Sequence, residues 1–320
     1  MWEVIETSKK IAETSSYVFI DKKAIVSLSE KIFNGSIPMP SWNRYYHFSG
    51  SDEDTVSYIL VLDSLNFCFW QQPGEKKWEI TYDSKPISGY YAMAASLKRA
   101  IQSGVKIIEP EYLIGLSLDT LKNILGGEGQ LQLMEERVKI LHQLGRLLAG
   151  EFNGKAYKLV EKARGSALNL TRLLADKLPS FRDTAQYNGK KVFFYKRAQI
   201  VAADLYGALE GRKWGNFIDI DKLTAFADYK LPQVLRRLEV LHYEPSLAYI
   251  VDGQTPIVSG AAQEVEIRAN TIWAVELIKQ ELYRMGKSLH AFEIDWLLWN
   301  LGQGGDCNKN PYHRTLTIFY

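Results

Sequence analysis

The feature that most constrains the fold is a series of helical patterns that fills most of the chain after residue 89. Apolar residues recur there at spacings of three and four, which places their side chains on one face of an α-helix. The pattern predicts helices over residues 2–12, 22–33, 89–101, 118–125, 133–148, 157–178, 197–209, 264–285 and 288–301. We therefore expect a mainly α protein with a helical body.

The other patterned segments are short and predict a small β-sheet near the N-terminus. Residues 57–70 are β-branched and aromatic at their start, which predicts a buried strand, and residues 78–82 alternate as its partner strand would. Asn188–Gly189 indicates a hairpin, and residues 312–320 predict a last strand. A chain of 320 residues exceeds the size at which single cores begin to split. We expect either one integrated domain over residues 1–320 or two tightly packed lobes.

Composition argues against several classes of protein. The formal net charge is +2 and no run of Lys and Arg occurs, so polymeric nucleic acid is not an expected partner. No apolar stretch approaches the ~20 residues of a membrane span, and residues 1–10 are polar rather than a secretory signal. Cys68 and Cys307 lack the spacing of a metal site and imply no disulfide. A soluble protein in the reducing cytoplasm, without a membrane partner, fits best.

The common catalytic motifs are missing. The sequence has no GxSxG, HExxH or P-loop pattern and no GxGxxG before a helix. None of the five histidines pairs with another at a spacing of four beside a carboxylate, so a zinc site is not expected. A hydrolase that works with carboxylates is compatible with these absences.

Polar residues interrupt an apolar run at residues 62–70. Asp63 and Asn66 need hydrogen-bond partners there, because an unpaired buried polar group is costly. One interpretation is that they satisfy nearby backbone at a bulge. The other is that Asn66 reads the edge of a base while Phe67 or another aromatic neighbour forms a pocket wall. The sequence supports both equally.

Asp228 lies four residues before Pro232, and Pro is favoured in the first turn of a helix. Asp228 is therefore expected at or near a helix start. It is either a helix cap or nearby loop residue, or a functional carboxylate that the positive helix end keeps ionised. The flanking Phe226 and Tyr229 favour a ligand, since flat ligands stack on aromatic faces.

Asp295 lies in an apolar helix that is rich in Trp. It borders a face formed by Leu289, Phe292, Trp296 and Trp299. Exposure to solvent is the simple explanation of a helical Asp. The functional alternative is that a carboxylate beside Trp rings suits a cationic transition state. Positive charge from Lys196 and Arg197, at a predicted helix start, is suited to a phosphate.

Five segments in one collinear order resemble the queuosine salvage protein family. They are LDSLNFCFW, FYKRAQIVAADL, FADYKLPQVLRRL, QEVEIRA (followed by Trp273 and Glu276) and IDWLLW, and the resemblance runs from about residue 15 to the C-terminus. It implies a fold similar to helix-hairpin-helix DNA glycosylases, used on a free nucleotide. It also implies hydrolysis of queuosine 5′-phosphate to queuine and ribose 5-phosphate, without cofactor or metal.

The resemblance implies roles for individual residues. The family's ligand-contacting aromatic and carboxylate fall on Phe226 and Asp228, and its catalytic carboxylate falls on Asp295. A pocket histidine of the family corresponds loosely to His47. Many relatives carry Asp where this chain has Asn300, which argues against a charged role there.

Cleavage of an N-glycosidic bond passes through a ribosyl cation that a carboxylate stabilises or attacks. We expect Asp295 to have this role and Asp228 to bind the base or its cationic amine, with the reverse assignment as the alternative. Stacking is expected from Phe226, Trp296 or Phe67, and phosphate contacts from Lys196, Arg197 or Lys230. The predicted substrate-binding residues are His47, Asn66, Phe67, Lys196, Phe226, Asp228, Tyr229, Trp296 and Asn300. Two rival functions are a non-catalytic carrier of queuine or another 7-deazaguanine, and a nucleic-acid base glycosylase.

Overall fold

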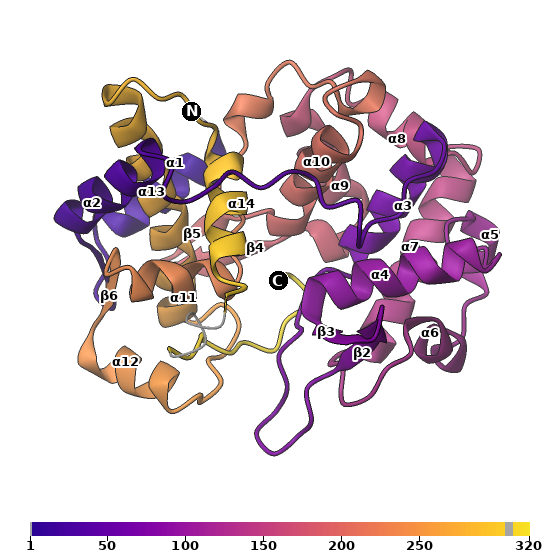
Figure 1. Ribbon diagram of the computed structural model, residues 1–320, viewed down its shortest axis with the longest axis horizontal. Helices are drawn as coiled ribbons and strands as arrows, with labels where there is room; N and C mark the ends of the chain where they lie inside the picture. The colour runs from indigo at the N-terminus through magenta and orange to yellow at the C-terminus, as the bar shows by residue number, and fades with distance from the viewer. Residues whose placement is uncertain (1, 305–309) are drawn as a thin grey trace.

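The chain is mainly helical, as predicted (Figure 1), in a computed structural model that describes residues 2–304 and 310–320. The α-helices are α1 (Glu3–Ala12), α2 (Lys22–Phe33), α3 (Asp52–Ser64), α4 (Gly89–Gln102), α5 (Pro110–Ile114), α6 (Leu118–Leu125), α7 (Met134–Glu151), α8 (Ala156–Lys162), α9 (Ala167–Lys177), α10 (Lys196–Ala208), α11 (Lys230–Arg237), α12 (Pro245–Asp252), α13 (Ala262–Arg284) and α14 (Ala291–Leu301). Short 3₁₀ turns occur at Pro179–Phe181, Lys213–Gly215 and Ile220–Lys222. Within the described ranges, no helix combines the length and the apolarity that a membrane crossing requires.

The strands form separate antiparallel pairs rather than one sheet. The pairs are β1 (Val18–Ile20) with β6 (Leu241–Tyr243), β2 (Glu79–Tyr82) with β3 (Lys85–Ser88), and β4 (Thr184–Tyr187) with β5 (Lys190–Phe193). The hairpin at Asn188–Gly189 is confirmed, and both turn residues have positive φ. The prediction of a single small sheet near the N-terminus is wrong, because β2 pairs with the next segment of the chain. Residues 312–320 contain only an isolated bridge from Arg314 to Pro256.

The largest error concerns residues 57–70, which were predicted as a strand. The segment begins in helix α3, which Ser51 caps by accepting a hydrogen bond from the Asp54 amide at 3.1 Å. All but one of residues 55–64 are buried. A helix that is covered on every side carries no polar face, so its sequence lacks the helical period and reads as a continuous apolar run.

Residues 65–70 follow α3 as an irregular segment, and a side chain donates hydrogen bonds to its backbone carbonyl groups. The buried guanidinium of Arg137, in α7, donates to the carbonyl oxygens of Leu65, Phe67 and Cys68. It also stacks 4.1 Å from the centre of the Phe67 ring. Arg137 therefore replaces the missing strand partner and fixes the position of Phe67.

The helix predicted over residues 157–178 is interrupted. Arg164 and Gly165 both have positive φ, and α9 restarts with Ser166 as its N-cap, which accepts from the Asn169 amide at 3.1 Å. Apolar residues continue at helical spacing on both sides of the break, so the pattern alone does not reveal it.

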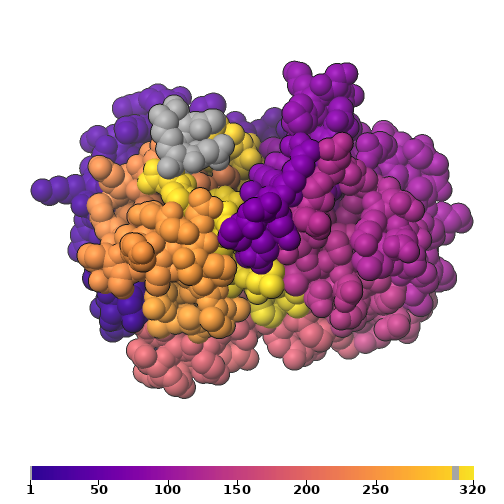
Figure 2. Space-filling view, turned by 90° about the horizontal axis from the view of Figure 1, so that it is seen from below, coloured from indigo at the N-terminus to yellow at the C-terminus, as the bar shows by residue number. Residues whose placement is uncertain are grey.

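Buried apolar residues form two large clusters that α13 and α14 connect. One cluster contains most of the buried residues of α3, α4, α7, α9 and α10, and the other those of α2, α11 and α12. Helix α13 gives Val265 to the first and Ile278 to the second, and α14 gives Phe292 and Ile294 in the same way. In the space-filling view, C-terminal residues lie between the orange and magenta parts of the chain (Figure 2).

We expect Arg137→Met to lower the free energy of unfolding by about 2–4 kcal/mol, because it leaves several buried carbonyl groups without a donor. Urea denaturation measures this change. Arg146→Met is the matched control, since Arg146 is exposed on the same helix, and we expect it to stay within about 0.5 kcal/mol of the wild type. Equal effects of the two substitutions would show that Arg137 does not support residues 65–70.

Candidate active site

A cavity of about 290 Å³ is lined by segments from most of the chain. Helices α4, α10 and α14 contribute to it, together with the irregular segments 40–47, 66–69 and 226–229 and the C-terminal Tyr320. All ten residues predicted for the site line this cavity: His47, Asn66, Phe67, Lys196, Phe226, Asp228, Tyr229, Asp295, Trp296 and Asn300. Arg197 was a further candidate for the phosphate, but its buried guanidinium donates to backbone carbonyls, including that of Ser64, and Arg197 does not line the cavity.

Three carboxyl groups in the cavity share one arrangement. In each, one oxygen accepts a hydrogen bond from the protein, and no described residue hydrogen-bonds to the other oxygen. Asp204 Oδ2 accepts from the Tyr90 hydroxyl at 2.8 Å. Asp295 Oδ2 accepts from the Phe226 amide at 2.7 Å. Asp228 Oδ1 accepts from two backbone amides. The cavity therefore offers three oriented carboxyl oxygens to a ligand.

Asp228 lies just before α11, as predicted. Its Oδ1 accepts the amides of Lys230 and Leu231, each at 2.8 Å, so it caps this helix from two residues before its start. The expectation that the helix end keeps it ionised is incomplete. Burial raises the pKa of Asp228, and the charge of Lys196 and the two amides oppose this rise only in part.

Asp295 is only 4% exposed, which excludes the simple explanation of a solvent-facing helical residue. Burial and the neighbouring charge of Asp228 raise the pKa of Asp295 well above its ordinary value, and the hydrogen bond from the Phe226 amide opposes this. Since Asp295 comes from α14 and Asp228 precedes α11, the bond to Phe226 joins the two acids into one wall of the cavity.

Asp204 was not predicted as a site residue. It lies in α10, within the segment FYKRAQIVAADL, and is buried. Burial raises the pKa of Asp204 to about 7, against the opposing effects of the Tyr90 hydrogen bond and the charge of Lys196. A lone Asp in an apolar helix was treated as a signal at Asp295, and the same signal at Asp204 would have identified it.

Lys196 is the buried cation of the cavity. Its Nζ donates to the Asn66 carbonyl at 3.2 Å and forms no ion pair with the carboxyl groups of the described residues. Burial lowers the pKa of Lys196, and the nearby charge of Asp228 opposes this most strongly. Asn66 lines the cavity beside Lys196, so both residues can contact a ligand.

Aromatic rings form much of the remaining wall. The His47 ring lies 4.2 Å from Trp42 and 5.4 Å from Tyr90, and burial lowers the pKa of His47 to about 3, so its ring is neutral. Asn300 is held by the protein, because its Oδ1 accepts from the Tyr91 hydroxyl at 3.2 Å. Six further lining aromatics were not predicted as site residues: Trp42, Tyr90, Tyr91, Trp299, Tyr312 and Tyr320.

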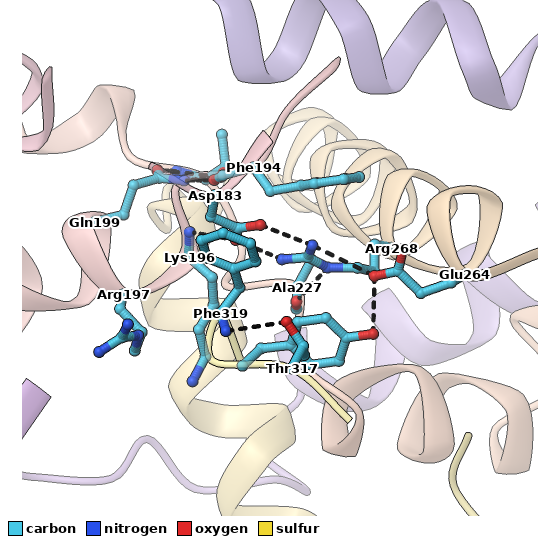
Figure 3. A network of polar contacts seen from close by, with 12 residues as sticks. Asp183, Phe194, Lys196, Arg197, Gln199, Ala227, Glu264, Arg268, Thr317 and Phe319 are labelled. Carbon is cyan, nitrogen blue, oxygen red and sulfur yellow. Dashed lines mark hydrogen bonds and ion pairs between the residues drawn. The ribbon is translucent and has the colours of Figure 1, made fainter. Parts of the chain in front are cut away.

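Behind the cavity, Arg268 of α13 fixes two of its walls (Figure 3). Its guanidinium binds both oxygens of Asp183, at 2.9 and 2.6 Å, and the Ala227 carbonyl at 3.0 Å. Asp183 in turn accepts the Lys196 amide at 3.1 Å. Glu264 also pairs with Arg268, at 3.5 Å, whereas Glu266 accepts backbone amides of Ser16, Tyr17 and Val18.

Among the described residues, no group of three or more His, Cys, Asp and Glu side chains is arranged to hold a metal ion. Cys68 is a buried free thiol, and Cys307 lies outside the described residues. The chemistry that the lining residues offer is that of carboxyl groups, lysine amines and aromatic faces.

A helical protein with an aromatic cavity and several buried carboxyl groups has the features of a hydrolase that acts through a cationic transition state. The sequence profile of the queuosine salvage protein family matches residues 46–320. A Sphaerobacter thermophilus protein named queuosine 5′-phosphate N-glycosylase/hydrolase is 44% identical, over 99% of this chain and 97% of its own. Proteins of that name from Mus musculus and Dictyostelium discoideum are 34% and 36% identical, over 98% and 99% of this chain and 98% of their own. The chain belongs to the queuosine salvage protein family.

The raised pKa of Asp204 predicts how stability depends on pH. Between its ordinary pKa of 3.8 and its folded pKa of about 7, the folded protein holds a proton that the unfolded chain has lost. The contribution of protonated Asp204 to the free energy of unfolding is therefore fully present below about pH 4, and it is lost as the pH rises to about 7. We expect Asp204→Asn to be more stable than the wild type at about pH 8, by on the order of 2–4 kcal/mol.

Urea unfolding of both proteins at about pH 5 and about pH 8 measures this difference. The difference in free energy of unfolding between the variant and the wild type should decrease at the lower pH, by roughly 1.4 kcal/mol for each pH unit below about 7. A gap that is the same at both values would contradict a raised pKa at Asp204.

Proposed function

We propose that this protein hydrolyses the N-glycosidic bond of queuosine 5′-phosphate and releases queuine and ribose 5-phosphate. The observation that carries the proposal is the set of three buried carboxyl groups, each with one oxygen free for a ligand, in an aromatic cavity. The family membership of the chain and the name of its relatives support this substrate. Water is the only second substrate, and we propose no cofactor or metal.

Asp295 is proposed to face C1′ of the ribose. As the C1′–N9 bond lengthens, positive charge develops on the ribosyl group, and an ionised carboxylate either stabilises or captures it. The Phe226 amide orients Asp295 for this role and leaves Oδ1 free. Burial raises the pKa of Asp295, but a cation beside it favours the ionised form, so its interaction with the ribosyl group strengthens as positive charge develops there.

Asp228 is proposed to bind the base or its side chain. Queuine carries a secondary amine that is cationic near neutral pH, and a carboxylate pairs with such a group through a charge-assisted hydrogen bond. Two backbone amides hold Asp228 Oδ1, which leaves Oδ2 for the ligand. In the reverse assignment Asp228 lies at C1′. Substitution of Asp228 would then reduce the rate, and substitution of Asp295 would reduce the affinity for the base.

The remaining lining residues are proposed to read the base and the phosphate. Phe226, Trp296 and Phe67 offer aromatic faces to the flat 7-deazaguanine, and the side-chain amide of Asn66 is suited to its polar edge. Lys196 is the buried cation for the phosphate, with Lys230 as a second lining cation. His47 and Tyr229 complete the wall near these groups.

The proposal extends to the architecture. A likeness to helix-hairpin-helix DNA glycosylases is supported by the mainly helical chain. A single domain over residues 1–320 is supported by α13 and α14, which contribute to both buried clusters. Use of a free nucleotide rather than a polymer is supported by the net charge of +2.

Queuine release from queuosine 5′-phosphate tests the proposal. We expect the wild type to release the base and Asp295→Asn to be folded but slower by about 10³-fold or more, since electrostatic groups at a reacting centre have effects of that size. Asp228→Asn is expected to weaken queuine binding more than it slows the reaction. Asp176→Asn is the matched control, because Asp176 is exposed on α9 and is not among the cavity's lining residues; it should behave as the wild type.

If the wild type binds queuine but releases none from the nucleotide, the protein is a carrier of queuine rather than a hydrolase. A larger rate loss in Asp228→Asn than in Asp295→Asn would reverse the two roles.

Binding to oligonucleotides separates a nucleotide hydrolase from a nucleic-acid base glycosylase. We expect no binding to single- or double-stranded oligonucleotides at physiological salt, because the chain lacks the excess of basic residues that phosphate backbones require. Fluorescence anisotropy over a salt titration measures this. Binding that tightens steeply as salt is lowered, together with release of a base from the oligonucleotide, would contradict the proposed substrate.

A further inference from the structure

Asp204 belongs to a different wall of the cavity from Asp228 and Asp295. It comes from α10, and the residue that holds it, Tyr90, comes from the start of α4. The other two acids are joined through the segment 226–228, which lies between α10 and α11 in sequence. The proposed function has roles for that pair and leaves Asp204 without one. Asp204 nevertheless lines the same cavity, and its Oδ1 accepts no hydrogen bond from a described residue.

The departing base needs a proton, and neither Asp228, which binds the base, nor Asp295, which faces C1′, supplies it in the proposed function. When the C1′–N9 bond breaks, its electron pair stays on the base, which must gain a proton to leave as neutral queuine. A 7-deazapurine has no N7, the nitrogen at which a purine base is usually protonated, so another ring atom must receive the proton. Glycoside hydrolases solve the equivalent problem with two carboxyl groups, one acting as an acid on the leaving group and one acting on the sugar cation.

We propose that Asp204 is the general acid that protonates the departing base, oriented for this by the Tyr90 hydroxyl. This inference rests on the proposed function, to which it adds a third catalytic residue. The hydrogen bond at Oδ2 leaves Oδ1 to carry the proton toward the ligand. Asp295 then acts on the ribosyl cation while Asp204 acts on the base.

The step balances in atoms and charge. The C1′–N9 bond breaks, and the proton of Asp204 passes to a ring nitrogen of the base, which leaves Asp204 as a carboxylate. Water forms a bond to C1′, and the proton that it loses restores the carboxylic acid. The sum is one water consumed, one queuine released and one ribose 5-phosphate formed.

The surroundings of Asp204 suit an acid that works near neutral pH. The titratable and charged groups that interact with it are Asp63 and Tyr58 of α3, Tyr90 and Tyr91 of α4, Lys196 of its own helix and Asp295 of α14. Burial has the largest effect and raises the pKa of Asp204 to about 7. A general acid is most effective when its pKa lies near the working pH.

Asp204→Asn tests the proposal through the rate and the affinity together. We expect kcat for queuosine 5′-phosphate to fall by about 10²–10⁴-fold, the usual contribution of a general acid. The dissociation constant of free queuine should stay within about threefold of the wild type. The wild-type kcat/KM should decline above about pH 7, and this decline should be absent in the variant. Circular dichroism checks that the variant is folded.

Tyr90→Phe supplies a readout that a merely structural role would not move. The Tyr90 hydroxyl favours the ionised form of Asp204, so its removal should raise that pKa and move the decline of kcat/KM to higher pH. Glu276→Gln is the matched control, because Glu276 is also a buried acid whose pKa burial raises, but it does not line the cavity. Its pH profile should match that of the wild type.

Two results would overturn the inference while the proposed function stands. One is an Asp204→Asn variant with kcat within about threefold of the wild type. The other is a loss of queuine affinity of about tenfold or more in that variant, which would make Asp204 a group that binds the base. A wild type that releases no queuine at all would instead contradict the proposed function itself.

Discussion

Arg268 connects three parts of the chain that are distant in sequence, and the geometry of the cavity depends on these bonds. Its guanidinium holds the carboxylate of Asp183 and the carbonyl of Ala227, the residue between Phe226 and Asp228. Asp183 uses its own carboxylate and carbonyl to accept the amides of Lys196 and Tyr195, where α10 begins. One buried ion pair therefore sets the segment that carries Phe226 and Asp228 and the helix that carries Lys196. A buried pair of this kind is costly to break, because either partner alone is an uncompensated charge.

The acids in the cavity oppose the stability of the fold. Burial raises the pKa of Asp204, Asp228 and Asp295, which means that the folded state disfavours their ionised forms. Further back, both carboxylate oxygens of Asp63 are buried without a hydrogen-bond partner among the described residues. Such groups are uncommon in a protein interior unless function requires them. Surroundings that disfavour ionised carboxyl groups favour a ligand group that brings positive charge beside them, and this agrees with a reaction whose transition state is cationic.

Periodicity and motifs predicted the elements and residues whose environment leaves a local trace. Helices with one exposed face, such as α2 and α6, were found nearly to the residue, because the polar face gives the sequence a period. Helix α3 was missed because all its sides are covered. The ten predicted residues come from separate segments, and their meeting in one cavity depends on tertiary packing that spacing does not encode. Trp42 was missed for a related reason, since a single Trp in a loop has the same local pattern whether it faces a ligand or the core.

The three carboxyl groups that accept hydrogen bonds through one oxygen only also explain why this cavity suits an enzyme better than a carrier of queuine. A carrier needs ligand contacts of constant strength, and a neutral acid or an amide would supply them. Each acid here is fixed through one oxygen, so it requires little reorientation when charge develops at the ligand. The attraction between an ionised carboxylate and a cation grows as the positive charge develops, so it acts mainly on the transition state. Interactions that strengthen only there raise the rate rather than the affinity. The burial that weakens the fold also lowers the local dielectric constant, which strengthens the attraction between a carboxylate and a cation.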